Sequence, residues 1–236
     1  MGAIGENLQA VRGRIERAAL AAGRDPADVT LLAVSKTFGA AQVREALAGG
    51  QRAFGESYVQ EAIGKIALLA GSGIEWHFIG PLQSNKTRPV AEQFDWVHSV
   101  ASLKIAQRLS QQRPAERAPL SVCLQVNVSG EATKSGVSEA EVLPLAQAVV
   151  ALPRLRLRGL MCIPAPASDA AAQRAPFARL RELQQRLRAA GLVLDTLSMG
   201  MSDDVEAAIA EGSTCVRVGS AIFGSRTTSA AEAQGG

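Results

Sequence analysis

Short apolar runs alternate with amphipathic segments along almost the whole chain. The first run, Val29 to Thr37, is bounded by polar residues and predicts a buried strand that ends near Lys36. Seven further strands are predicted at 52–56, 74–80, 96–100, 119–128, 157–163, 194–198 and 214–218. Helical spacing predicts a helix before the first strand, closed by Gly23, and others at 39–48, 58–69, 86–93, 103–112, 139–151, 175–190 and 203–211.

This order predicts an α/β protein built as a single (β/α)8 TIM barrel over residues 1–226, with an extra N-terminal helix. Strict alternation of strands and helices favours a parallel sheet, and eight units allow the sheet to close. A doubly wound open sheet is the alternative, but no G-x-G-x-x-G motif follows the first strand. Residues 227–236, rich in small and polar residues, are predicted to form a disordered tail.

Composition narrows the class of protein. Hydrophobic residues make up 47% of the 236 residues and aromatic residues only 4%, so aliphatic side chains must fill the core. The net charge is +3, but the arginines at 179–188 are interleaved with Glu182 and lack neighbouring aromatic residues. This pattern indicates solvated helix faces rather than a nucleic-acid site.

Cysteine usage and hydropathy favour a cytoplasmic protein. Cys123, Cys162 and Cys215 each lie in apolar segments without CxxC spacing, which is typical of buried thiols in a reducing compartment. No apolar run approaches the length that spans a membrane, and the charged N-terminus does not resemble a secretory signal. We expect no metal site, no membrane association and a monomer.

Lys36 is the first candidate for chemistry, because parallel α/β folds keep their sites at the carboxyl ends of strands. Two interpretations stand. Lys36 is either a solvated cation that closes its strand, or a partly desolvated amine that forms a Schiff base with a carbonyl compound.

Two Gly- and Ser-containing loops near the last two strands are candidates for anion binding. Residues 198–202 lead into a helix that starts near Asp203, and residues 218–220 follow the last strand. Their backbone amides could converge on an anion, although ordinary turns have the same composition. An imine-forming amine paired with a phosphate-binding loop suggests a phosphorylated aldehyde, of which pyridoxal 5′-phosphate is the common example.

Six motifs carry a resemblance to a known family. They are LAVSKT at 32–37, FGESYVQE at 54–61, WHFIGPLQSNK at 76–86, GLM at 159–161, SMGMSD at 198–203 and RVGSAIFG at 217–224. Together they resemble the YggS/PROSC family of pyridoxal-phosphate homeostasis proteins, which is similar to the barrel domain of bacterial alanine racemase.

The resemblance implies roles for individual residues in binding pyridoxal 5′-phosphate. Lys36 would hold the cofactor as an internal aldimine, and Arg217 would face the pyridine nitrogen. The remaining expected cofactor contacts are Ser57, His77, Met199, Ser202, Gly219 and Ser220, with the last three at the phosphate. His77 could instead be a satisfied core histidine.

Two positions depart from the family pattern. The family usually has asparagine at the position of Ser57, and many members have a second lysine at the position of Phe38. The first departure puts one polar contact in doubt, whereas the second leaves Lys36 less ambiguous.

Arg217 favours holding the cofactor over turnover. Guanidinium can only donate, so it would keep the ring nitrogen unprotonated and the ring a weaker electron sink. We therefore expect a protein that buffers and supplies the cofactor, with apo-enzymes that depend on it as partners.

Two other functions remain open. A racemase needs a second base, and the chain has one tyrosine, Tyr58, and no predicted second domain. The other is a Schiff-base aldolase that uses no cofactor.

Three further polar residues have expected roles. His98 is expected to be structural. Glu56 is expected to orient neighbouring polar groups or to lie exposed at the end of its strand. Lys134 is expected to be a loop lysine that is either solvated or reaches the site.

Overall fold

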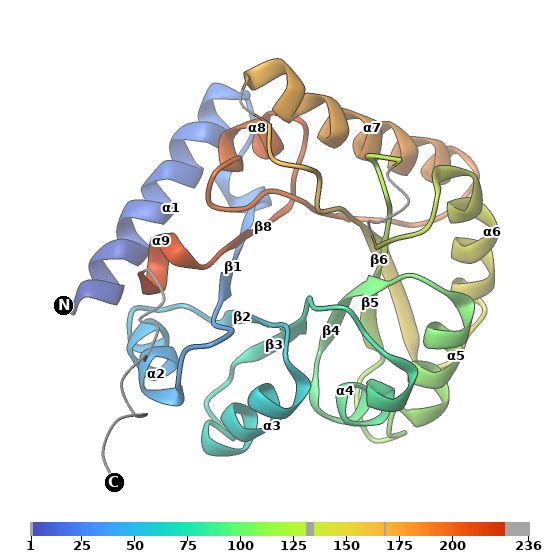
Figure 1. Ribbon diagram of the computed structural model, residues 1–236, viewed down its shortest axis with the longest axis horizontal. Helices are drawn as coiled ribbons and strands as arrows, with labels where there is room; N and C mark the ends of the chain where they lie inside the picture. Colours follow the sequence, from blue (N-terminus) through green and yellow to red (C-terminus); the bar gives the residue numbers. More distant parts are fainter. Residues whose placement is uncertain (1, 131–134, 168, 225–236) are drawn as a thin grey trace, which may run out of the picture.

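The computed structural model describes residues 2–130, 135–167 and 169–224, and within these ranges eight parallel strands close into a barrel (Figure 1). The strands are β1 (Thr30–Val34), β2 (Ala53–Glu56), β3 (Glu75–Phe78), β4 (Trp96–Val100), β5 (Leu120–Gln125), β6 (Leu155–Met161), β7 (Thr196–Ser198) and β8 (Cys215–Val218). Each strand pairs with the next along the chain, and β8 pairs with β1. The predicted barrel is confirmed.

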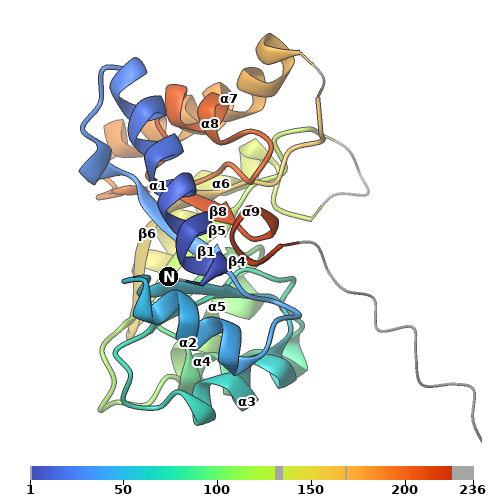
Figure 2. The same cartoon turned by 90° about the vertical axis from the view of Figure 1, so that its left-hand side faces the viewer.

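Helices surround the barrel as the alternating pattern predicted (Figure 1). They are α1 (Ala3–Ala21), α2 (Ala40–Ala48), α3 (Val59–Leu68), α4 (Thr87–Gln93), α5 (Leu103–Gln112), α6 (Glu139–Val150), α7 (Ala170–Ala189), α8 (Val205–Ala210) and α9 (Ser220–Phe223), with 3-10 turns at η1 (Pro26–Asp28) and η2 (Ser84–Lys86). The extra N-terminal helix α1 packs against α8, α9 and α2, as Figure 2 shows from the side.

Two helices differ from the sequence prediction. The loop expected after β8 contains the short helix α9. Helix α7 begins at Ala170 rather than near residue 175, because the Asp169 carboxylate caps it by accepting a hydrogen bond from the amide of Ala172. The capping signal was present in the sequence but lay upstream of the periodic apolar positions.

Apolar side chains pack in two layers. A large cluster fills the space between the strands and the helices. A small cluster of Leu32, Ala53 and Cys215, with Ile79 packed against it, lies apart from the large one. Since side chains alternate along a strand, residues two apart share a face. This alternation places Arg217 on the same face as Cys215.

Other predictions on the whole chain have separate outcomes. No helix in the described ranges is long and apolar enough to cross a membrane. Within the same ranges, no three His, Cys, Asp or Glu side chains gather as they would around a metal ion. The three cysteines are free and buried, as predicted. Lys134 and the tail at 227–236 lie outside the described residues.

Candidate functional site

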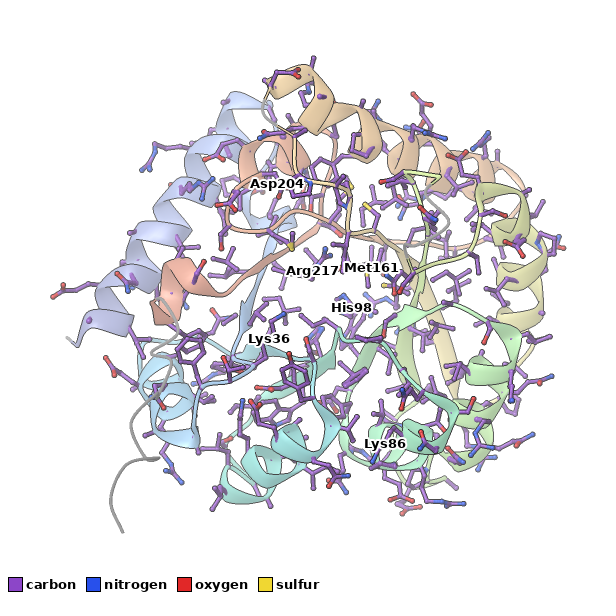
Figure 3. The ribbon with its side chains drawn as sticks, in the orientation of Figure 1. Lys36, Lys86, His98, Met161, Asp204 and Arg217 are labelled. Carbon is purple, nitrogen blue, oxygen red and sulfur yellow. The ribbon has the colours of Figure 1, made fainter. Side chains whose placement is uncertain are left out.

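A cavity of about 360 Å³ lies at the carboxyl end of the barrel. Its lining includes six of the predicted site residues, namely Lys36, Ser57, Ser202, Arg217, Gly219 and Ser220. Figure 3 shows Lys36 and Arg217 directed toward the middle of the barrel, whereas Lys86 lies outside it near α4. The fold therefore brings the candidate amine and the candidate anion-binding loops to the same cavity.

The turn that carries Lys36 is held on both sides of the lysine. The carbonyl of Ser35, which precedes it, accepts a hydrogen bond from Lys65 Nζ at 2.7 Å. The amide of Thr37, which follows it, donates to Glu61 Oε1 at 2.7 Å. Thr37 has a φ of 71°, in the left-handed region that β-branched residues rarely adopt. These two hydrogen bonds therefore stabilise a backbone conformation that Thr37 disfavours, and they fix the position of Lys36 beside it.

Lys65 and Glu56 form a buried ion pair next to this turn. Lys65 Nζ lies 2.7 Å from Glu56 Oε1 and 2.5 Å from Glu61 Oε1. The hydroxyl of Ser35 donates to the same oxygen of Glu56. Burial raises the pKa of Glu56, and the hydrogen bonds from Lys65 and Ser35 offset that rise only in part. Glu56 is thus not an exposed carboxylate, and Lys65 has a structural role that sequence reasoning missed.

Two serine hydroxyls from different loops meet at the cavity. Ser220 Oγ, at the start of α9, lies 3.4 Å from Ser202 Oγ in the loop between β7 and α8. Gly219 lets the chain pass close to β1, because a Cβ there would come within 3.2 Å of the carbonyl oxygen of Val34. Arg14 of α1 fixes the other loop by donating to the carbonyl of Ser202. Sequence reasoning gave Arg14 no role.

Arg217 supplies a buried positive charge to the cavity. Its side chain is only 4% exposed. Nη1 donates to Ser198 Oγ at 2.7 Å, and Nη2 donates to the carbonyl of Cys162 at 2.8 Å. Burial lowers the pKa of Arg217, but a guanidinium remains protonated at neutral pH. Arg217 can therefore donate to an unprotonated ring nitrogen and has no acceptor to offer a protonated one.

Apolar side chains also line the cavity, and sequence reasoning did not identify them as a wall. They are Val34, Phe38, Ile79, Ile163 and Met201. Phe38 stacks on Phe223 of α9 with ring centroids 5.0 Å apart, so this position contributes packing where many relatives were expected to have an amine. Apolar residues at strand ends have the same sequence pattern as core residues, which left no signal to separate them.

Two predicted cofactor contacts, His77 and Met199, lie away from this cavity. Met199 is fully buried in the large apolar cluster, and Met201 lines the cavity instead. His77 lines a second cavity, of about 380 Å³, together with Glu75 and His98. This second cavity, the amino-end cavity, also involves the first residues of several strands. Neither His77 nor Met199 is therefore among the residues that line the carboxyl-end cavity.

The carboxyl-end cavity has the chemistry that a phosphorylated aromatic aldehyde requires. It offers a primary amine at Lys36, two hydroxyls beside a glycine, a buried guanidinium and apolar walls. Asp203 adds a carboxylate to the lining. A volume of about 360 Å³ falls in the range of small-molecule sites.

Sequence comparison finds close relatives over almost the whole chain. Residues 6–227 match the family model described as alanine racemase, N-terminal domain. A pyridoxal phosphate homeostasis protein of Pseudomonas aeruginosa is 66% identical, over 96% of this chain and 97% of the relative. The pyridoxal phosphate homeostasis protein of Escherichia coli K12 is 55% identical, over 96% of this chain and 98% of the relative.

Structural comparison agrees with this result. The structure of PipY from Synechococcus elongatus with PLP bound has a TM-score of 0.82 and 40% identity, over 94% of this chain and all of that one. Alanine racemase of Corynebacterium glutamicum has a TM-score of 0.69 at 19% identity, over 98% of this chain and 63% of that one. The second likeness shows a shared barrel fold.

Proposed function

The chain belongs to the family of pyridoxal phosphate homeostasis proteins, whose barrel is the alanine racemase N-terminal domain, and from this we propose that it binds pyridoxal 5′-phosphate in the carboxyl-end cavity. The observation that carries the proposal is the convergence of Lys36, the Ser202 and Ser220 hydroxyls and Arg217 on one cavity. The cofactor supplies an aldehyde, which a lysine amine can bind covalently with loss of water.

Six residues that line the cavity have a part in this proposal. Lys36 is the amine that holds the cofactor, and the turn around it keeps that amine in place. Ser202, Gly219 and Ser220 bind the phosphate, and Ser57 is a further contact. Arg217 donates to the ring nitrogen and keeps it unprotonated.

We further propose that the protein stores and supplies the cofactor and turns over no substrate. An unprotonated ring withdraws electrons weakly, which favours holding the cofactor over carbanion chemistry. Racemisation would also require a second base, and Tyr58, at 54% exposure, is not among the residues that line the described cavity. Apo-enzymes that need the cofactor are the proposed partners. A cytoplasmic monomer, with three free buried thiols, suits that role.

Reduction of the protein with borohydride, after loading with pyridoxal 5′-phosphate, tests the role of Lys36. We expect a visible absorbance band before reduction and a stable adduct on the peptide that contains Lys36. Lys36→Ala should abolish both. Lys86→Ala, which removes a lysine outside the barrel, should change neither.

Two results would contradict the proposal. An adduct that persists at another lysine in Lys36→Ala would rule out the assignment of the amine. Racemisation of any L-amino acid, followed by optical rotation, at about 1 s⁻¹ or faster would make the protein an enzyme of ordinary rate.

A further inference from the structure

A row of hydrogen-bonded side chains runs through the barrel interior and ends at Arg217. Glu75 Oε1 lies 2.7 Å from His77 Nε2, and His77 Nδ1 lies 2.9 Å from His98 Nε2. His98 Nδ1 lies 2.7 Å from Ser198 Oγ, which accepts from Arg217 Nη1 at 2.7 Å. We call these five residues the relay. Its first member is 51% exposed and the other four are buried, so the relay joins the amino-end cavity to the carboxyl-end cavity.

The two ends of the relay fix the direction of every bond while His77 is neutral. Its hydrogen bond to His77 lowers the pKa of Glu75, so the carboxylate is ionised near neutral pH and only accepts. His77 therefore carries its proton on Nε2, and its bare Nδ1 accepts from His98. That leaves Nδ1 of His98 to accept from the hydroxyl of Ser198. At the other end, Arg217 can only donate.

One added proton reverses the middle of the relay. Burial, reinforced by the charges of His77 and Arg217, lowers the pKa of His98 well below its usual value. His98 therefore stays neutral, and a proton that arrives from the amino-end cavity resides on His77. Protonated His77 donates from both nitrogens, so His98 must accept at Nε2 and carry its own hydrogen on Nδ1. Ser198 then accepts from both sides, and its hydroxyl hydrogen turns away from His98.

We propose that His77, His98 and Ser198 are positioning residues for Arg217, and that the relay transmits the protonation of His77 to the cofactor cavity. The reversal turns the hydroxyl of Ser198, which is the hydrogen-bond partner of the guanidinium that faces the ring nitrogen, from a donor to His98 into an acceptor from it. The link to the cofactor rests on the proposed function, whereas the reversal itself belongs to the chain alone.

Among the charged residues around the relay, Glu75 is the one that forms a hydrogen bond with His77. The ring of His77 stacks on Trp96 of β4 with centroids 5.3 Å apart. Arg158 of β6 lies 4.6 Å above the same indole and pairs with Asp195 at 2.8 Å. The other charged residues that line this cavity are Arg24 and Asp28. His98 faces His77 on one side, and Ser198 and Arg217 on the other.

Nitrogen NMR of the cofactor-free protein tests the reversal directly. The chain has two histidines, and both are in the relay, so a ¹⁵N-histidine sample gives signals from these two rings. In spectra in which His77 carries one hydrogen, we expect that hydrogen and the hydrogen of His98 to lie on Nε2 of their rings. When acidification adds a second hydrogen to His77, we expect His98 to carry its hydrogen on Nδ1. His77→Gln assigns the signals and should leave His98 in one tautomer throughout the same acidification series.

Addition of pyridoxal 5′-phosphate tests the link to the cofactor. Its binding should shift the His77 signals of the wild type and of Ser110→Ala, which removes a buried hydroxyl elsewhere. Ser198→Ala should lose that shift, while borohydride trapping reports separately whether cofactor is present. A His98 tautomer that is the same whether His77 carries one hydrogen or two, or a His77 that gains no second hydrogen while the protein stays folded, overturns the relay. A shift that survives in Ser198→Ala overturns its coupling to Arg217.

Absence of any trapped cofactor in the wild type has a different meaning. It would contradict the proposed function and the coupling to the cofactor, but not the reversal seen in the cofactor-free protein. The two failures are therefore distinguishable within the same set of samples.

Discussion

Replacement of Lys65 by methionine should destabilise this protein strongly. Lys65 is 5% exposed and its ammonium contacts Glu56, Glu61 and the carbonyl of Ser35. Methionine has similar length but no charge, so the fully buried Glu56 would keep only the hydroxyl of Ser35 as a hydrogen-bond partner among the described residues. Breaking a buried ion pair from one side costs about 3–5 kcal/mol, which lowers the Tm of a chain of this size by about 6–20 °C.

Urea unfolding followed by circular dichroism measures this loss as a change in midpoint at constant m-value. Lys104→Met, on the exposed face of α5, is the matched control and should stay within about 0.5 kcal/mol of the wild type. Glu56→Gln combined with Lys65→Met removes both charges and should recover at least about 1 kcal/mol relative to the single variant. A loss below about 1 kcal/mol in Lys65→Met would refute the view that this pair holds the turn of Lys36.

The pH dependence of the same variant follows from the raised pKa of Glu56. The folded state holds this proton more tightly than the unfolded state, whose glutamate titrates near pH 4.3. The contribution of Glu56 to stability is therefore full below about pH 4.3 and is lost as the pH rises through the folded-state pKa. Lys65 lowers the folded-state pKa of Glu56, so the removal of Lys65 raises that pKa and extends the stabilising contribution of Glu56 to higher pH. The deficit of Lys65→Met should be smaller at pH 5 than at pH 8.

Two further predictions concern the thiols and a close backbone contact. Burial raises the pKa of Cys162 to about 12 and that of Cys215 to about 11. Thiol reagents at pH 8 should therefore label the native protein slowly and the urea-unfolded protein fully. Rapid labelling of the native protein would contradict this prediction. Gly159→Ala should fold poorly, because its Cβ would lie 1.8 Å from the carbonyl oxygen of Thr196. The control Gly64→Ala, on the exposed side of α3, should stabilise the protein by about 0.5–1 kcal/mol. Equal thermal stability of the two variants would show that β6 and β7 can separate at no cost.

The order of strands and helices could be predicted from the sequence because their periodicity is local. The strand at Trp96–Val100 and the helix at Leu103–Gln112 have the predicted bounds. Once eight alternating units form a parallel barrel, the carboxyl end of each strand must face the same side. That rule alone brought Lys36 and the loop of Ser202 to one cavity.

Tertiary structure decided the contacts that no local pattern contains. The sequence left His77 open to a core or a cofactor role and favoured a structural role for His98, and only hydrogen bonds between distant strands connect the two to Arg217. His98 meets Ser198 across 100 positions of sequence, and Arg14 meets Ser202 across 188. The sequence by itself determined that Lys36 and the loop of Ser202 lie at the carboxyl end of the barrel. Burial and hydrogen bonding between distant strands decided which polar groups are held there, because those depend on distances in space.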